Sequence, residues 1–373
     1  MRILFLSYFF PGPLGAMASW LAERPEIQVI FAASRSRQEQ GLPNMKRVVL
    51  RSYNGKARVN PGWFELWEEA LRAGKSAAST LDMVRESGFD PDIVCCATSN
   101  GSAFGLRQIF PDSFIVNFLE ELSIFPSGQV KMRRALQSLQ ILEANLSFIY
   151  NEKARNAYAQ ELRELIKPAP MIIDCDFFSP EKAQPLMSLQ GRTIGRELVT
   201  VFAHGLTEKE LFHLWHGALL ILAMRPHCQL FFIVPGAYLL KRLNKLPIDE
   251  KIAERLFLFS QLRQETLRDL LCASALAIFP GRHSPFGLLE CMSCATTPLC
   301  GEPHFFLKNG WDMLELPKAS AIAESVNAAL QNRELLNVIG MHARQTAVVN
   351  FASVNVMPHF FPKIEKACEE WNS

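Results

Sequence analysis

The chain has 373 residues, about twice the length of a usual domain, so the sequence predicts two domains. Hydrophobic residues make up 49% of it and charged residues 20%, which is enough apolar material for two cores. The 39 lysines and arginines nearly balance the 37 aspartates and glutamates, and a net charge of +2 gives no reason to expect a nucleic acid as the partner.

The cysteine usage and the apolar runs favour a cytoplasmic protein. The nine cysteines are odd in number and two of them, Cys95 and Cys96, are adjacent, which indicates reduced thiols rather than a disulfide framework. Residues 2–10 imitate a secretory signal peptide, but the prolines that follow favour a buried first strand. The apolar runs at 217–224 and 228–234 are too short to cross a bilayer.

The first half of the sequence alternates short apolar runs with helical patterns. Near-continuous apolar strands are typical of a parallel sheet that helices cover on both faces. Between the runs, apolar residues recur at helical spacing, most clearly from 63 to 71. This alternation predicts a Rossmann-like domain over residues 1–180. Its expected strands are residues 2–8, 27–33, 47–50, 92–97, 114–118 and 146–150.

A polar stretch punctuated by prolines predicts a linker at residues 181–195, after which the alternation restarts. It predicts a second Rossmann-like domain over residues 196–355. The expected strands are residues 199–203, 229–234, 256–259 and 276–279, and helices are expected at 211–222, 320–330 and 334–349. Residues 356–373 are expected to form a helix that packs back on the first domain. Two such domains in series predict an α/β architecture with a cleft between the carboxyl ends of both sheets.

Several segments resemble, in order along the chain, the retaining glycosyltransferases of family 4. The run Phe-Gly-Leu-Leu-Glu-Cys-Met-Ser-Cys at residues 286–294 is similar to the family's Phe-Gly turn and its Glu-Ala-Met-Ala-Cys-Gly helix start. Residues 1–12, 90–94 and 173–180 are similar to segments of one bacterial subgroup. The resemblance implies a diverged bacterial member with the GT-B fold, in which two Rossmann-like domains face each other across a cleft and the C-terminal one holds the nucleotide sugar.

The chemistry of a nucleotide-sugar donor explains why the family uses such residues. Breaking the bond to the sugar leaves a diphosphate, whose growing negative charge is stabilised by cations or by backbone N–H groups at a helix N-terminus. A single carboxylate accepts hydrogen bonds from both ribose hydroxyls. A site for this donor therefore needs a cation, a helix start and a carboxylate at one edge of the sheet.

The resemblance supplies a carboxylate and a helix start. It implies that Glu290, the second acid of the family's E-x7-E motif, binds the ribose; the alternative is that Glu290 only charges the start of a helix. The turn of Ser284, Phe286, Gly287 and Leu288 precedes a helix expected to begin near Glu290, so its N–H groups would face the phosphates.

The cation comes from a second segment. The run His-Gly-Leu-Thr-Glu-Lys that begins at His204 resembles the family's Gly-Arg-Leu-x-x-Glu-Lys-Gly turn, whose arginine and lysine clamp the diphosphate. Lys209 is retained and Gly205 belongs to the turn, whereas His204 stands at the arginine position and Glu210 at that of the last glycine. A histidine carries full charge only when it is protonated.

The first acid of the E-x7-E motif is replaced by Arg282, at a position that contacts the donor sugar in the family. An arginine cannot accept hydrogen bonds from sugar hydroxyls, but it can pair with a phosphate or an acidic sugar. The replacement leaves two alternatives open: donor recognition has been rebuilt, or activity has been lost.

The first domain carries the expected acceptor side. Gly12 and Gly15 follow the first strand, where the family brings backbone close to the donor phosphate and the acceptor, although turn chemistry alone explains them nearly as well. Ser99 and Asn100 end another strand and are expected to face the same cleft. Glu120 matches a family acid and is a candidate acceptor contact; the alternative is an exposed loop acid.

Two further signals carry less weight. Cys291 and Cys294 have the spacing of a metal or redox motif, but a zinc site usually needs a second pair, so no metal is predicted. The basic run at residues 131–134 allows a peripheral membrane contact, although a solvated helix start explains it better.

Together these features predict a retaining glycosyltransferase, with Lys209 and Glu290 as the catalytic residues. It would move a sugar from a nucleotide-diphosphate donor to a glycan, a lipid-linked or a protein acceptor, without a cofactor. The alternative is a degenerate homologue that binds nucleotide sugars or serves as a partner subunit. Another GT-B enzyme, such as an epimerase or a phosphorylase, is a third candidate. The base, the sugar, the acceptor and the oligomeric state stay open.

Overall fold

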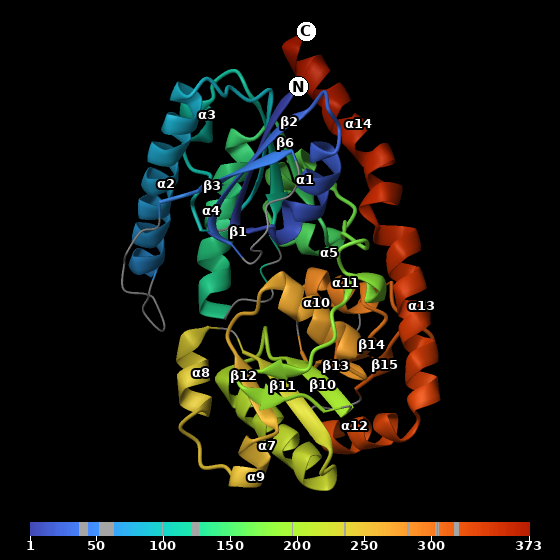
Figure 1. The fold of residues 1–373 in the computed structure, drawn as a ribbon. Helices are drawn as coiled ribbons and strands as arrows, with labels where there is room; N and C mark the ends of the chain where they lie inside the picture. The colour runs from blue at the N-terminus through green and yellow to red at the C-terminus, as the bar shows by residue number, and fades with distance from the viewer. Residues whose placement is uncertain are drawn as a thin grey trace. The chain divides into compact units, whose positions relative to one another are not determined.

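A computed structural model describes most of the chain. The described residues are 1–36, 44–51, 63–98, 100–120, 122, 127–195, 197–234, 236–281, 284–302, 304, 306–316 and 321–373. They divide into two compact units (Figure 1). Unit 1 comprises Met1–Ile172 and Ser353–Ser373, and unit 2 comprises Ile173–Ala352. The sequence had placed the corresponding boundaries at residues 180 and 355.

Unit 1 is built on a parallel sheet of seven strands in the order β3-β2-β1-β4-β5-β6-β7. Alternate side chains of its strands enter two cores, so that Phe5 and Leu6 of β1 lie on opposite faces and both are fully buried. The strands are β1 Arg2–Phe10, β2 Gln28–Ser36, β3 Met45–Val49, β4 Ile93–Ala97, β5 Phe114–Leu119, β6 Leu146–Ile149 and β7 Ile166–Pro168.

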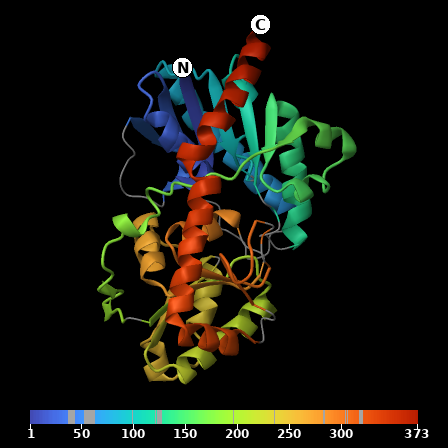
Figure 2. The same cartoon turned by 90° about the vertical axis from the view of Figure 1, so that its right-hand side faces the viewer.

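Helices cover both faces of this sheet. α1 (Gly15–Ala22) and α14 (Ser353–Asn372) pack on one face, and α2 (Trp63–Glu86) and α3 (Leu106–Ile109) on the other (Figures 1 and 2). The C-terminal helix α14 belongs to this core because Phe360 packs 5.1 Å from the ring of Phe148. The shorter elements are η1 Gly12–Leu14, α5 Glu152–Arg155 and α6 Gln160–Leu165, and α4 spans Ser127–Glu143.

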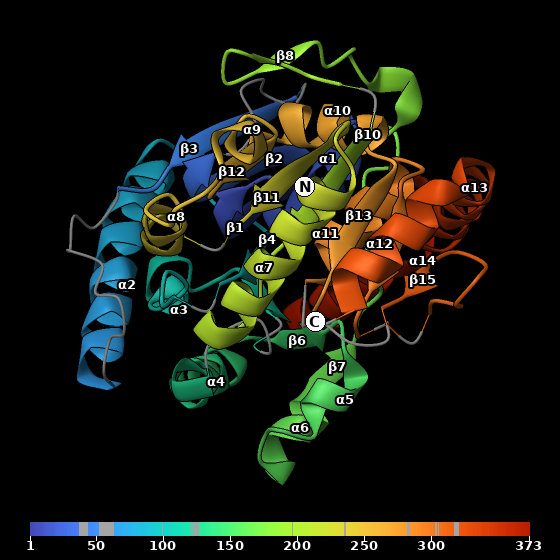
Figure 3. The same cartoon turned by 90° about the horizontal axis from the view of Figure 1, so that it is seen from below.

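Unit 2 repeats the design with a parallel sheet of six strands in the order β12-β11-β10-β13-β14-β15. α7 (Glu208–Met224) and α12 (Ile322–Gln331) lie side by side on one face (Figure 3). The strands are β10 Glu197–Phe202, β11 Cys228–Ile233, β12 Leu256–Phe259, β13 Leu276–Phe279, β14 Thr297–Cys300 and β15 Leu314–Glu315. The other helices are η3 Pro180–Lys182, α8 Ala237–Leu243, α9 Glu250–Ala253, α10 Gln264–Ala273, α11 Pro285–Ser293 and α13 Arg333–Phe351.

The stretch predicted as a linker, residues 181–195, belongs to unit 2. It contains the short antiparallel pair β8 (Ser188–Leu189) and β9 (Arg192–Thr193). Leu189 and Ile194 pack against a small core that includes Phe257. Polar composition suggested a linker, but a few apolar side chains are enough to hold the stretch on the sheet.

Both sheets contain a switch point, which is the place where the chain stops adding strands on one side and starts adding them on the other. In unit 1 the chain runs outward from β1 to β3 and then returns to place β4 beside β1. In unit 2 it runs from β10 to β12 and returns to place β13 beside β10. Open α/β sheets bind ligands at the carboxyl ends of the strands that flank such a point. The predicted class of two Rossmann-like folds is therefore confirmed, and it fixes where a site is expected in each unit.

No described helix is both long and apolar enough to cross a membrane.

Candidate functional site

The two predicted donor segments meet at the switch point of unit 2. They follow β10 and β13, which are hydrogen-bonded neighbours. Phe202 and Phe279, the last residues of the two strands, stack with their ring centroids 4.7 Å apart. Beyond them, a Cβ added to Gly281 would lie only 2.6 Å from Cδ2 of Leu206, so the two loops touch. Segments that lie far apart in the sequence thus form one edge of the sheet.

The helix that follows β10 has a capped N-terminus. Thr207 is the N-cap of α7, and its Oγ1 accepts a hydrogen bond from the backbone N–H of Glu210 at 3.3 Å. The carboxylate of Glu210 accepts in return from the backbone N–H of Thr207 at 2.7 Å. Gly205 has a φ of +71°, which lets the chain turn sharply between the strand and this cap. Glu210, which replaces a family glycine, therefore completes a capping box.

Around this cap, the charged groups differ in how they are paired. Glu208 forms an ion pair with Arg242 of α8. Lys209 is exposed and makes no hydrogen bond or ion pair with another described residue. His204 lies half-buried in the turn. Within the described part of this turn, the exposed ammonium group of Lys209 is available to an anionic ligand.

The helix that follows β13 starts in a different way. α11 begins at Pro285, so the expectation of a helix start near Glu290 is wrong. Proline is favoured at the first helical position because its fixed φ suits the helix and its missing N–H needs no partner there. Ser284 is the N-cap but makes no side-chain capping bond within the described chain. A Cβ added to Gly287 would meet no heavy atom of the described residues within 4 Å, so open space adjoins the first turn.

The earlier start of α11 changes the interpretation of several predicted residues. Phe286 and Gly287 lie in the first helical turn, both half-buried, while the Leu288 side chain is fully buried in the core. Glu290 is half-buried in the second turn, which weakens the alternative that it only charges a helix start. Arg282 lies outside the described residues, and its predicted role stays a prediction.

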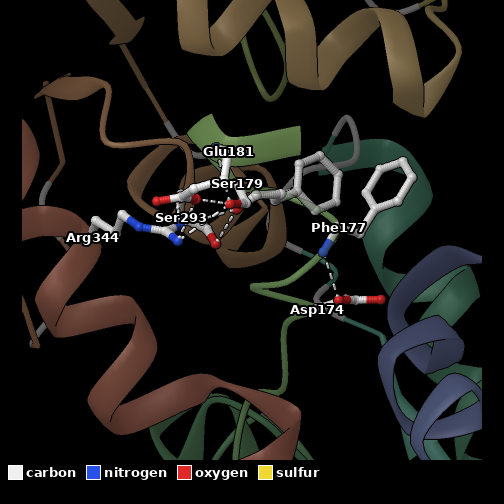
Figure 4. Close-up of polar contacts among 7 residues, drawn as sticks. Asp174, Phe177, Ser179, Glu181, Ser293 and Arg344 are labelled. Atoms are coloured by element: carbon white, nitrogen blue, oxygen red, sulfur yellow. Dashed lines mark hydrogen bonds and ion pairs between the residues drawn. The ribbon is translucent and has the colours of Figure 1, made fainter. Parts of the chain in front are cut away.

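The C-terminal end of α11 is held by a polar network that the sequence did not predict. The Arg344 guanidinium, from α13, points into a group of oxygens from Ser179, Glu181 and Ser293 (Figure 4). It lies 3.0 Å from the Glu181 carboxylate and donates to the backbone carbonyl of Ser293. The Ser293 hydroxyl donates to the carbonyl of Phe178 at 2.6 Å. A cation thus satisfies a carbonyl at the end of the candidate donor helix and ties it to the segment that enters unit 2.

At the switch point of unit 1, the conformation of the turn explains why both predicted positions are glycine. Gly12 has a φ of +52°, and a Cβ there would lie 2.9 Å from Oγ of Ser7. A Cβ on Gly15 would lie 2.2 Å from Cβ of Pro11. The tight turn between β1 and α1 therefore requires glycine at both positions with or without a ligand.

The polar side chains of the loop after β4 also form hydrogen bonds within the protein. The Asn100 side chain accepts from the backbone N–H of Ser102 at 3.1 Å and from its hydroxyl at 2.7 Å, which is a local turn. Thr98 is buried and accepts a hydrogen bond from Gln140 at 3.2 Å. Ser99, another predicted acceptor-side residue, lies outside the described residues.

Glu120 has a charged environment that favours more than an exposed loop acid. It is half-buried after β5, and its backbone carbonyl accepts from Gln137 at 3.0 Å. Burial lowers the pKa of Arg133, and the nearby Glu120, Glu69 and Tyr8 act in the opposite direction. The basic run at 131–134 is therefore not simply solvated, because Arg133 packs toward this acidic group and only Lys131 of the run is exposed.

Part of unit 1 matches a known protein family. Residues 25–126 match the sequence model of the Glycosyl transferase family 4 group. Among proteins with curated functions, none matches the sequence. The match spans β2 to β5 and includes Asn100 and Glu120, and it confirms the resemblance for this part of the chain.

Solved structures with the same fold cover nearly the whole chain. HepE from Anabaena, solved in complex with UDP and glucose, matches with a TM-score of 0.67 at 15% identity over 98% of this chain and 99% of that one. A trehalose 6-phosphate synthase from Burkholderia multivorans matches with a TM-score of 0.66 at 12% identity over 100% and 98% of the two chains.

A third structure with this fold represents another class of enzyme. A putative UDP-N-acetylglucosamine 2-epimerase from Listeria monocytogenes has a TM-score of 0.57 at 15% identity over 96% of each chain. Identities this low establish the fold and leave the chemistry to the site. The chain has the GT-B fold of two Rossmann-like units, and its residues 25–126 are similar to the family 4 group of glycosyltransferases.

Proposed function

We propose that the chain is a retaining glycosyltransferase that binds a nucleotide-diphosphate sugar at the switch point of unit 2. The observation that carries this proposal is the start of α11, where the N-cap side chain makes no capping bond and no described residue lies within 4 Å of a Cβ built on Gly287. Backbone N–H groups in the first turn of a helix bind anions well, because they lack intrahelical partners and the helix dipole favours negative charge.

The roles of the other residues follow from their positions at the same edge. Lys209 supplies an exposed ammonium group to the diphosphate. Glu290, one turn further along α11, accepts hydrogen bonds from the two ribose hydroxyls. His204 and Gly205 line the turn before α7, where His204 can donate to a phosphate oxygen.

The transfer step needs few further groups. The bond between the anomeric carbon and the phosphate oxygen breaks, and a bond from the acceptor oxygen to the same carbon forms. The departing phosphate takes the acceptor proton, so that no side-chain base is required at this face. The helix start and Lys209 stabilise the charge that grows on the phosphate, which is the main electrostatic demand of the step.

Unit 1 would supply the acceptor contact. The half-buried Glu120 lies beside Arg133 at the carboxyl edge of β5, where it can accept a hydrogen bond from an acceptor hydroxyl. The acceptor would be a glycan, a lipid-linked saccharide or a protein. We propose that the reaction needs neither a cofactor nor a metal, and that it takes place in the cytoplasm, with a peripheral membrane contact if the acceptor is lipid-linked.

A nucleotide-sugar binder without transferase activity is the second candidate. The capping box of α7 favours it, because Thr207 and Glu210 satisfy N–H groups that a phosphate would otherwise bind. In such a protein the donor would bind at α11 alone and would not react.

A thermal-shift screen with UDP, GDP, ADP, CMP, TDP and their sugars tests the proposal. A ligand at about 100 times its Kd adds about 2.7 kcal/mol to the stability of the folded state. We expect one base to raise the unfolding midpoint, and we expect the rise to disappear in Glu290→Ala. Release of free nucleotide and sugar transfer from the bound donor would support the transferase, and binding without either would support the second candidate. No shift with any nucleotide would contradict both.

A further inference from the structure

Two cysteines of unit 2 come together from separate helices. Cys272 lies in the last turn of α10, and Cys294 is the C-cap residue of α11. The two thiols are close enough to affect each other's pKa, and neither cysteine is in a disulfide. The spacing in the sequence suggested Cys291 as the neighbour of Cys294, whereas the fold brings Cys272 to it.

The backbone around the pair fixes this contact. The hydroxyl of Thr296, just after Cys294, donates to the carbonyl of Leu271 at 2.6 Å. The Cys294 thiol also lies 3.9 Å from the carbonyl of Arg268, one turn before Cys272. The end of α11 is thus held against the last two turns of α10, which carry Cys272.

The two thiols differ in exposure and in acidity. Cys272 is half-buried, so a small oxidant can reach it, whereas Cys294 is only 2% exposed. The hydrogen bond from Cys294 lowers the pKa of Cys272, Arg268 and Arg344 act in the same direction, and burial and Asp269 oppose them. Burial raises the pKa of Cys294 well above its usual range. The more acidic of the two thiols is therefore also the accessible one, and the thiolate is the form that oxidants attack.

We propose that Cys272 and Cys294 form a reversible dithiol–disulfide site whose substrate is a peroxide. Hydrogen peroxide oxidises the Cys272 thiol to a sulfenic acid and releases water. The Cys294 sulfur then attacks the Cys272 sulfur, the S–S bond forms and a second water leaves. A thiol reductant restores both thiols by exchange.

The neighbouring cysteines are poorly placed for this chemistry. Cys291 is fully buried, and its thiol faces the carbonyl of Thr296 at 3.4 Å. Burial also raises the pKa of Cys300 to about 12, so its thiolate is scarce near neutral pH. No group of three metal-ligating side chains occurs in the described parts of the chain, so the pair does not belong to a larger ligand cluster.

The disulfide would close a loop that contains β13 and the start of α11, the region of the candidate donor site. The proposal does not depend on sugar transfer, because it rests only on the two thiols and their surroundings. A cross-link lowers the conformational entropy of the unfolded chain and so stabilises the folded state. The oxidised protein should therefore unfold at a temperature higher by roughly 5 °C.

Peptide mapping of the full-length protein tests the site directly. The reduced protein is treated with a small excess of hydrogen peroxide, its remaining thiols are alkylated, and trypsin digestion follows without reductant. Cleavage after Arg268 and Arg282 separates Cys272 from Cys294, so a disulfide appears as a pair of linked peptides that dithiothreitol separates. Fragmentation of the linked pair identifies which cysteine is joined to Cys272.

A link between Cys272 and Cys294 is the expected result. A link from Cys272 to Cys291 or Cys300, oxidation of Cys272 to a sulfinic acid without a link, or no reaction at Cys272 would overturn the proposal. Cys272→Ser should abolish both the link and the rise in unfolding temperature, and the matched variant Cys291→Ala should keep both. The mapping of the unaltered protein decides the outcome even if a variant fails to fold.

Discussion

The starts of α7 and α11 occupy equivalent places and are built in opposite ways. Each helix follows one of two neighbouring strands at the carboxyl edge of the same sheet. α7 begins with a complete capping box from Thr207 and Glu210. α11 begins with Pro285 after an N-cap serine that makes no capping bond, and the described residues leave space beside Gly287.

Under the proposed function, the capped start of α7 serves stability and the start of α11 serves a ligand. An N-cap side chain contributes about 1 kcal/mol to a helix, so a start that lacks the bond gives up stability that a cap would provide. A helix start without a side-chain cap, with no described residue close to a Cβ on Gly287, suits an anion, because the helix dipole favours negative charge there. The following predictions test whether α11 is the ligand-binding start and α7 the structural one.

The largest expected effect is at Glu290 of α11. Replacing it with glutamine removes the charge that strengthens hydrogen bonds to the ribose, worth about 1.5–3 kcal/mol, so nucleotide affinity should fall by about 10- to 100-fold. Glu208→Gln is the matched control at the start of α7, where the acid pairs with Arg242 instead. Isothermal titration with the nucleotide found in the screen measures both variants. Equal losses of nucleotide affinity in the two variants would mean that the starts of α7 and α11 do not differ in ligand binding.

Gly287→Ala should separate binding from stability by moving them in opposite directions. A methyl group here enters open space and replaces a glycine within a helix, so the free energy of unfolding should rise by about 0.5–1 kcal/mol. The same methyl group blocks the approach of a phosphate to the first turn, so affinity should fall by about tenfold, or about 1.4 kcal/mol. Chemical denaturation and titration of one protein sample give both values. Unchanged affinity would place the ligand elsewhere.

The sequence was informative wherever strands are long and buried on both faces. The central strands β1, β4, β5, β10 and β13 are mostly apolar runs, and their positions were predicted to within a few residues. β14 was missed because Pro298 interrupts a four-residue run, although the strand is fully buried between two neighbours. β7 and β15 were missed because edge strands of two or three residues leave no periodic signal.

The contacts within the candidate site were harder to predict from the sequence than the strands. The capping signature Thr-x-x-Glu was present at Thr207 and Glu210, and it explains Glu210 without a loss of function. Arg344 had no such signal, because its four acceptors come from segments that only the folded chain brings together. The pairing of Cys272 with Cys294 was hidden for the same reason, since it depends on how α10 packs on α11.

A pair of cap substitutions sharpens the comparison at the level of stability. Thr207→Ala removes the capping box of α7 and should lower the free energy of unfolding by about 1 kcal/mol, with nucleotide affinity unchanged. Ser284→Ala removes no capping bond and should change stability by no more than a few tenths of a kcal/mol. Urea denaturation followed by circular dichroism measures the difference. A larger loss of stability in Ser284→Ala would contradict this geometry, because it would mean that the Ser284 side chain does cap α11.

The smallest expected effect is at Lys209, and it qualifies the contrast between the two helices. α7 is capped, so its contribution to the ligand would come from this exposed side chain rather than from its backbone. Lys209→Met keeps the length of the side chain and removes the charge, and exposed charge pairs are worth about 0.2–1 kcal/mol, so affinity should fall by about two- to fivefold.

Salt distinguishes a role of the Lys209 charge from a change in packing. A screened attraction weakens as ionic strength rises, so nucleotide affinity of the unaltered protein should fall with added salt, and that of Lys209→Met should fall less. Lys251 of α9, also exposed, precedes β12 and lies toward the opposite edge of the sheet, so Lys251→Met should retain the full salt dependence. If both variants behave like the unaltered protein, α7 contributes nothing to binding and the ligand is held by α11 alone.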